Sequence, residues 1–150
     1  MRIRVTSIFL TTLIFSAGVL SQRLPAPVKQ YLDRNYRGWK LAGCYGEKSN
    51  SVLSGDFDGN GKRDYAIKFI RGKQGFLMAF LDKRMTFAPY YLHIWNDPDE
   101  ARFSSLILFK KGDTEQSGTP ILRFDSPADF ECDSDVGGVH TYRNGKFIAY

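Results

Sequence analysis

The 150-residue chain has little cysteine and little histidine, with two residues of each. It lacks the motifs His-Glu-x-x-His, Gly-x-Ser-x-Gly and Gly-x-x-x-x-Gly-Lys-Ser/Thr, and it shows no repeat at a period of about 20 to 50 residues. No stretch has the composition of a disordered or fibrous protein. These absences argue against a repeat protein, a fibre and the familiar catalytic sets, and we predict that the chain is not an enzyme.

Long apolar runs are absent as well, except at the N-terminus. Residues 8–20 form an apolar run after the basic residues Arg2 and Arg4, and small residues are placed as signal peptidase prefers, at Ser16, Ala17, Gly18 and Ser21. The run is shorter than the roughly 20 residues of a comfortable membrane span. We therefore predict a signal peptide over residues 1–21, cleaved after Gly18 or Ser21, with an uncleaved anchor as the alternative.

The remaining residues, 22–150, have ordinary globular composition, since the whole chain is 43% hydrophobic and 25% charged. This length supports one secreted or periplasmic domain with its own core. Cleavage after Ser21 leaves 19 Lys and Arg against 16 Asp and Glu, a net charge of +3. The cations stand in isolated pairs rather than in a stripe, so we predict neither a nucleic-acid partner nor, after cleavage, a membrane partner.

Both cysteines, Cys44 and Cys132, lie in the exported part. An even count in an oxidising compartment favours a disulfide between them, which would close a long loop and contribute about 4 kcal/mol in the chain-entropy model. Two buried free thiols are the alternative.

The hydrophobic pattern predicts one helix followed by strands. Pro25 and Pro27 open the helix and Gly38 is placed to end it, while one face carries apolar residues at three- and four-residue spacing: Val28, Tyr31, Leu32 and Tyr36. Short apolar or alternating runs predict strands at 39–44, 52–57, 64–70, 76–81, 90–95, 105–109, 121–124, 139–142 and 146–150.

Three features of these runs predict how the strands pair. Asn144-Gly145 is the strongest two-residue signal for a hairpin. Residues 76–81 are apolar on both faces and predict a central strand, whereas 64–70 alternate as in a strand with one wetter face. Strands so close in sequence pair antiparallel. We therefore predict an α+β fold, with one N-terminal helix packed on a twisted, mostly antiparallel sheet.

The most specific pattern is a loop over residues 56–64. Oxygen-bearing side chains stand at loop positions 1, 3, 5 and 9, Gly61 stands at position 6 where the chain must turn sharply, and the carbonyl of Lys62 is available at position 7. Ca²⁺ takes such oxygen ligands, whereas Mg²⁺ demands a tighter octahedron. The sequence predicts a Ca²⁺ site formed by Asp56, Asp58, Asn60, Lys62 and Asp64. A hairpin loop that binds nothing is the alternative.

The loop differs from an EF-hand, because position 12 is Ile67 rather than Glu and the flanks are predicted strands. Its residues Gly55-Asp56-Phe57-Asp58-Gly59-Asn60-Gly61 and Asp64-Tyr65-Ala66-Ile67 resemble the calcium loops of FG-GAP and VCBS-type repeats, as in the β-propellers of integrin α chains. The resemblance implies a structural Ca²⁺ that pins a connection between two strands. It does not extend to the propeller, which requires several blades.

A second resemblance lies near the N-terminus. Leu24-Pro25-Ala26-Pro27-Val28-Lys29-Gln30-Tyr31-Leu32, followed by Tyr36-Arg37-Gly38-Trp39, is similar to the opening helix of small secreted PepSY-like domains. This resemblance implies a small exported domain of a binding type.

An acidic cluster follows later, with carboxylates alternating at Asp129, Glu131, Asp133 and Asp135. One hypothesis is that Glu131 or Asp133 completes the calcium shell in place of the missing position-12 Glu. The alternative is a solvated acidic loop held by the Cys132 disulfide.

Other candidate residues favour structure over catalysis. His93 and His140 lie within predicted strands and have no partner at a motif spacing, so we expect packed or hydrogen-bonded histidines. Residues 96–100 predict a turn. The aromatic residues Phe87, Tyr90, Tyr91 and Trp95 favour core packing over a carbohydrate platform.

Two functions remain. The favoured one is an exported, calcium-binding, disulfide-stabilised binding or interaction module with a structural metal and an unknown protein or glycan ligand. The alternative is a small secreted hydrolase of glycan or peptide that uses carboxylates near the metal loop. The sequence specifies neither the ligand nor an oligomeric state.

Overall fold

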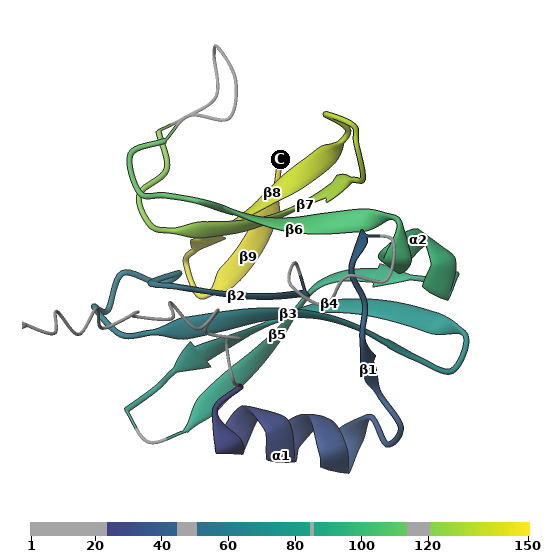
Figure 1. The fold of residues 1–150 in the computed structure, drawn as a ribbon. Helices are drawn as coiled ribbons and strands as arrows, with labels where there is room; N and C mark the ends of the chain where they lie inside the picture. Colours follow the sequence, from purple (N-terminus) through teal and green to yellow (C-terminus); the bar gives the residue numbers. More distant parts are fainter. Residues whose placement is uncertain (1–23, 45–50, 85, 114–120) are drawn as a thin grey trace, which may run out of the picture.

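The computed structural model describes residues 24–44, 51–84, 86–113 and 121–150. The predicted signal peptide, residues 1–21, lies outside the described residues. Within the described residues the chain forms two helices and nine strands (Figure 1). In chain order they are α1 (Ala26–Asn35), β1 (Lys40–Leu41), β2 (Val52–Gly55), β3 (Asp64–Arg71), β4 (Gln74–Asp82), β5 (Phe87–Trp95), α2 (Pro98–Arg102), β6 (Ser104–Phe109), β7 (Ser126–Glu131), β8 (Gly137–Arg143) and β9 (Lys146–Ala149).

The strands form two antiparallel sheets. Sheet A has the order β1-β3-β4-β5, and β2 pairs with β3 beside β1; sheet B has the order β6-β7-β8-β9. The α1 helix, sheet A and sheet B are stacked as three layers, with sheet A in the middle (Figure 1). A mixed fold of few helices and antiparallel strands therefore agrees with the α+β prediction, but the single sheet is wrong, because the strands divide between two layers.

The sequence of β4 explains why sheet A is covered on both sides. Successive side chains of a strand point to opposite faces. Phe76, Met78 and Phe80 pack with Val28 and Leu32 of α1, whereas Leu77, Ala79 and Leu81 belong to the cluster that includes Leu106 of sheet B. The strand lies between β3 and β5, so the predicted central strand is confirmed.

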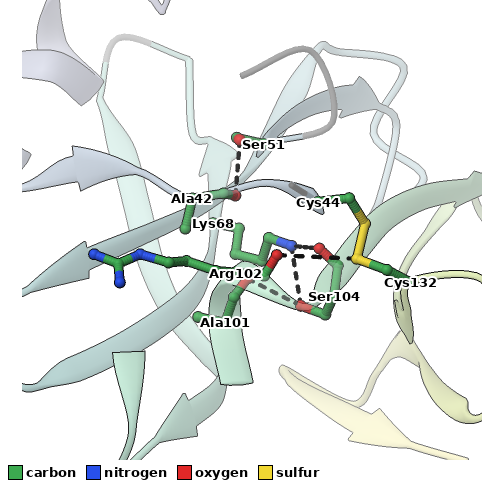
Figure 2. Close-up of a disulfide and its surroundings, with 8 residues drawn as sticks. All are labelled: Ala42, Cys44, Ser51, Lys68, Ala101, Arg102, Ser104 and Cys132. Carbon is green, nitrogen blue, oxygen red and sulfur yellow. Dashed lines mark hydrogen bonds between the residues drawn. A yellow bond between two sulfur atoms is a disulfide. The ribbon is translucent and has the colours of Figure 1, made fainter. Parts of the chain in front are cut away.

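The neighbouring strand β3 corrects a prediction. Its alternating pattern predicted one wetter face, yet Lys68 in its middle is 0% exposed. The reason is sheet B, which covers this face and supplies a partner: Lys68 Nζ donates to the Ser104 carbonyl and, at 3.0 Å, to Ser104 Oγ (Figure 2). A lysine in a strand was therefore a poor guide to solvent exposure.

Two further corrections concern the second half of the chain. The predicted strand at 121–124 is absent, and the strand is Ser126–Glu131 instead. Apolar alternation missed it because it contains Pro127 and the buried Asp129, which is held by hydrogen bonds rather than by solvent. The predicted turn at 96–100 begins the short helix α2, whose N-cap Asp97 accepts from the Asp99 backbone N–H.

The predicted C-terminal hairpin is confirmed. β8 pairs with β9 up to Arg143↔Lys146. Asn144 and Gly145 between them have φ of 50° and 83°, the two positive values that a type I′ turn requires.

A disulfide links the two sheets at one end. Cys44 follows β1 and Cys132 follows β7, and their Cα atoms are 5.9 Å apart (Figure 2). Close to it, the Lys68 ammonium bridges β3 and the first residue of β6. The sandwich is thus closed at this end by a covalent bond and by a buried hydrogen-bonded cation. No helix in the described part of the chain is long and apolar enough to span a membrane.

Candidate functional site

The predicted calcium loop connects β2 and β3 at the opposite end of the sandwich. The two strands pair as far as Gly55↔Asp64, so the first and last predicted ligands are brought together. Carboxylate oxygens of Asp56, Asp58 and Asp64 all lie within 4.8 Å of one another. Ligands on opposite sides of a Ca²⁺ ion stand about 4.6 to 5.2 Å apart, so the three carboxylates fit one ion of this size.

Local hydrogen bonds give the loop its shape. Asp58 Oδ1 accepts from the Asn60 backbone N–H at 3.2 Å, and Asp56 Oδ2 accepts from the Gly61 N–H at 3.0 Å. Gly59 and Gly61 have φ of 76° and 77°, a region that suits glycine. The sharp turn predicted at Gly61 is present, and Gly59 provides a second one.

Asp64 is the buried base of the loop. Its Oδ2 accepts from the Phe57 N–H at 2.7 Å and its Oδ1 from the Asp82 N–H at 2.8 Å. Burial, with a smaller contribution from the charges of Asp58 and Asp56, raises the pKa of Asp64 to about 6 in spite of these two donors. The three carboxylates therefore repel one another, and a cation between them would relieve that repulsion.

Asp56 carries an oxygen without a partner. Its Oδ1 is buried and accepts no hydrogen bond, a condition shared in the described residues only by Thr141 Oγ1. An unsatisfied buried polar group costs about 1 to 3 kcal/mol. This oxygen, beside two other carboxylates, has the chemistry of an open metal ligand.

One cation of the chain already contacts the cluster. Lys83 Nζ lies 2.5 Å from Asp58 Oδ2, and this hydrogen bond raises the pKa of Lys83. The Asp58 side chain is only 5% exposed, so the pair is protected from solvent on the carboxylate side. A single ammonium offsets only part of the charge of three carboxylates.

The other two predicted ligands are placed less directly. The Asn60 amide donates to the Asp82 carbonyl at 3.0 Å and accepts from the Lys62 N–H at 2.8 Å. The Lys62 ammonium forms a 3.6 Å ion pair with Asp82. Coordination by the Asn60 side chain and the Lys62 carbonyl remains a prediction.

A residue that the sequence did not indicate lies next to the loop. Asp125 Oδ2 accepts from the Asp56 N–H at 3.3 Å, and Asp125 Oδ1 accepts from the Lys111 N–H at 3.1 Å. Asp125 is 69 residues from Asp56 in sequence, and no spacing rule connects them. Asp125 directly precedes β7, so this hydrogen bond connects the loop to sheet B.

Because Asp125 lies beside the loop, the course of β7 contradicts the hypothesis that Glu131 or Asp133 completes the calcium shell. β7 begins at Ser126, immediately after Asp125, and ends at Glu131. A strand rises about 3.3 Å per residue, so Glu131 stands at the far end of β7 from the loop, and Asp133 follows it.

The far end of the sandwich holds a cavity of about 750 Å³. Its walls come from the end of β5, α2, β7 and the following turn, and β8. Five carboxylates line it, at Asp97, Asp99, Glu100, Asp129 and Glu131. Two imidazoles and two aromatic rings line it as well, at His93, His140, Trp95 and Phe103.

Asp129 is the centre of the polar wall. His140 Nε2 lies 2.6 Å from Asp129 Oδ1, and His93 Nδ1 lies 3.2 Å from Asp129 Oδ2. Burial works to raise the pKa of Asp129, but the hydrogen bonds from His140 and His93 outweigh it and hold that pKa well below its usual range. Both histidines are therefore hydrogen-bonded, as expected, through a partner that the sequence did not identify.

The cavity favours positive charge on its wall. The hydrogen bond to Asp129 raises the pKa of His93 against the effect of burial, and the charge of Glu100 adds to the increase. Behind the wall, burial lowers the pKa of Lys68 to about 8, and the charge of Asp129 opposes that shift. Asp129 thus interacts with three basic groups from three different strands: it is hydrogen-bonded to His93 and His140, and its charge acts on Lys68.

Comparison with known proteins identifies no relative. No protein-family model matches the chain, and neither a curated protein nor a solved structure matches it. The loop and the cavity are therefore the features that bear on function.

Proposed function

We propose that this chain is an exported, calcium-binding, disulfide-stabilised domain that acts as a binding module, with the metal in a structural role. The observation that carries the metal assignment is Asp56 Oδ1, a buried oxygen without a hydrogen-bond partner. It belongs to a group of three carboxylates whose ligand atoms lie within 4.8 Å of one another. An all-oxygen set on a short loop suits Ca²⁺, and the likeness of the loop to those of FG-GAP repeats supports the same ion.

The surroundings of the loop support a structural role. Asp64 accepts a hydrogen bond from the Asp82 N–H at the end of β4, and the Asp56 N–H donates to Asp125, which directly precedes β7 of sheet B. An ion held by Asp56 and Asp64 would therefore fix β2, β3, β4 and the neighbouring sheet at one end. The residues that line the cavity all lie outside the loop, so the ion and a ligand in the cavity would be separate.

The cavity supports the binding role. Its volume of about 750 Å³ falls in the range of about 300 to 1,000 Å³ that is typical of ligand sites. The hydrolase alternative requires a cleft at the carboxylates of the metal loop, and the cavity lies at the other end. The Cys44–Cys132 disulfide is compatible with an oxidising, extracellular or periplasmic location.

Thermal unfolding of the mature, oxidised protein tests the metal assignment. We expect Ca²⁺ at a hundredfold excess over its Kd to stabilise the fold by about 2.7 kcal/mol relative to chelator. Asp56→Asn should fold in chelator and gain no stability from Ca²⁺. The amide carries no negative charge, and its NH₂ group takes the place of one of the two carboxylate oxygens. Asp135→Asn, an exposed carboxylate outside the loop, is the matched control and should respond to Ca²⁺ as the wild type does.

A second variant removes the competing cation. Lys83→Gln should bind Ca²⁺ several-fold more tightly than the wild type, because Asp58 no longer holds an ammonium. No response to Ca²⁺ in either the wild type or Lys83→Gln would contradict the proposed metal site.

A further inference from the structure

We propose that the cavity beside α2 binds a cationic side chain of a peptide, a lysine ammonium or an arginine guanidinium on its apolar stem. The proposal rests on the proposed function of a binding module and adds the class of ligand. Three observations support it: the charge of the lining, the exposed apolar groups beside that charge, and the absence of a metal-like convergence.

The lining carries one sign of formal charge in excess. It has five carboxylates and no lysine or arginine, so carboxylates outnumber imidazoles even with both histidines protonated. This is a local concentration, because the whole chain has a formal net charge of +5. A cleft lined by one sign of charge focuses its field on a ligand of the opposite sign.

Two of these carboxylates are open to a ligand. Asp129 is bound by two imidazoles, Asp99 forms a 2.5 Å ion pair with Arg102, and Asp97 caps α2. The exposed carboxylates of Glu100 and Glu131 make no hydrogen bond or ion pair with the residues that the structure describes. A cation that enters the cavity is partly buried and needs a partner of opposite charge. The carboxylates of Glu100 and Glu131 can accept hydrogen bonds from such an ammonium or guanidinium.

Aromatic and apolar side chains stand beside the charge. The His93 and Trp95 rings stack with centroids 4.3 Å apart and planes at 15°. Phe103 is 57% exposed and Val136 is 62% exposed, and both line the cavity. A lysine or arginine stem covers apolar surface while its head stays polar, and a cation gains further from an aromatic face.

The geometry favours an organic cation over a metal ion. Among the described residues, the group of three metal-ligating side chains whose atoms lie within 4.8 Å is the loop group at the other end. The two imidazoles of the cavity approach different oxygens of Asp129, and no three imidazole or carboxylate side chains among the described lining residues bring their ligand atoms within 4.8 Å of one another. The raised pKa of His93, caused first by Asp129, agrees with a wall that stabilises a delocalised positive charge.

The test uses calorimetric titration of the mature, oxidised protein in millimolar Ca²⁺ at pH 7. The probes are two blocked tripeptides, acetyl-Ala-Arg-Ala-amide and the same peptide with citrulline, which has the shape of arginine without its charge. We expect the arginine peptide to bind at least tenfold more tightly than the citrulline peptide. Glu131→Gln should weaken the arginine peptide several-fold, whereas the matched change Asp135→Asn, outside the lining, should leave it unchanged.

Equal affinities for the two peptides would overturn the proposal, as would binding of the neutral sugar cellotriose with no binding of the arginine peptide. Thermal unfolding with Ca²⁺ and with chelator, measured on the same preparation, separates the two proposals. A calcium response without arginine binding overturns the cavity proposal alone. Arginine binding without a calcium response supports the cavity proposal and contradicts the calcium site.

Discussion

The two ends of the sandwich are built in opposite ways. At the loop end, the carboxylates Asp56, Asp58 and Asp64 come from nine consecutive residues and meet within 4.8 Å. At the cavity end, Asp129 meets His93 across 36 residues and His140 across 11 residues of sequence. One site is local in sequence and the other depends on the complete fold.

The two ends also differ in what holds them together. The cavity end has the Cys44–Cys132 disulfide and the buried Lys68 beside it (Figure 2). The loop end has hydrogen bonds to Asp64 and Asp125 and a cluster of like charges. A covalent bond stabilises one end under all ionic conditions, whereas the other end should depend on a cation.

The largest expected effect comes from the covalent end. The double change Cys44→Ser and Cys132→Ser should reduce the free energy of unfolding by about 4 kcal/mol, because the reduced chain gains loop entropy when it unfolds. Denaturant unfolding measures this loss. If the two ends are independent, the variant retains the stabilisation by Ca²⁺; a loss of that response together with the disulfide would show that they are coupled.

A glycine pair tests the loop end. A Cβ at Gly59 would lie 2.1 Å from the Phe124 ring, while a Cβ at Gly61 would meet nothing within 4 Å. Both residues have positive φ, which costs a side chain about 1 to 2 kcal/mol. Crowding should add about 1 to 3 kcal/mol at Gly59 alone.

Gly59→Ala should therefore destabilise the protein by about 3 kcal/mol and Gly61→Ala by about 1 kcal/mol, both measured by denaturant unfolding in chelator. Equal losses would mean that the loop does not pack on Phe124.

The smallest effect concerns the pH response of the cavity end. The Asp129 hydrogen bond raises the pKa of His93, so this interaction stabilises the fold fully below about pH 6.5 and is lost as the pH rises through the raised value. The lowered pKa of Asp129 has the opposite sign: its contribution is present above about pH 4 and is lost in acid. The two windows overlap between about pH 4 and 6.5.

NMR titration of the His93 ring measures this directly. We expect a pKa above 6.5 in the wild type. The His93 pKa should fall in Asp129→Asn and fall by less in Glu100→Gln. Because Glu100 is exposed, Glu100→Gln still provides the test if the buried Asp129→Asn variant does not fold. An unchanged His93 pKa in both variants would contradict the charged wall of the cavity.

The contrast between local and distant contacts also explains what the sequence could predict. The α1 helix, the central position of β4 and the Asn144-Gly145 hairpin follow from short-range periodicity and turn chemistry, and so does the approach of Asp56 to Asp64. Each of these features depends on residues that are close together in the sequence.

The predictions failed where a polar residue is buried against a partner that is distant in the sequence. Lys68 indicated a wet face but is buried on Ser104, and Asp129 indicated a solvated loop but lies in β7 between two imidazoles. A polar residue that is buried and satisfied by a partner far away in the sequence cannot be told from a solvated one by periodicity. The division into two sheets was missed for the same reason.

The most direct test of the account is the stoichiometry of Ca²⁺ binding, measured by isothermal titration calorimetry on metal-free wild type and Asp56→Asn. We expect one Ca²⁺ per wild-type chain and none on Asp56→Asn, with both proteins folded. A wild-type protein that binds no Ca²⁺ at millimolar concentration, or an Asp56→Asn variant that binds it as tightly, would contradict the calcium site at the loop.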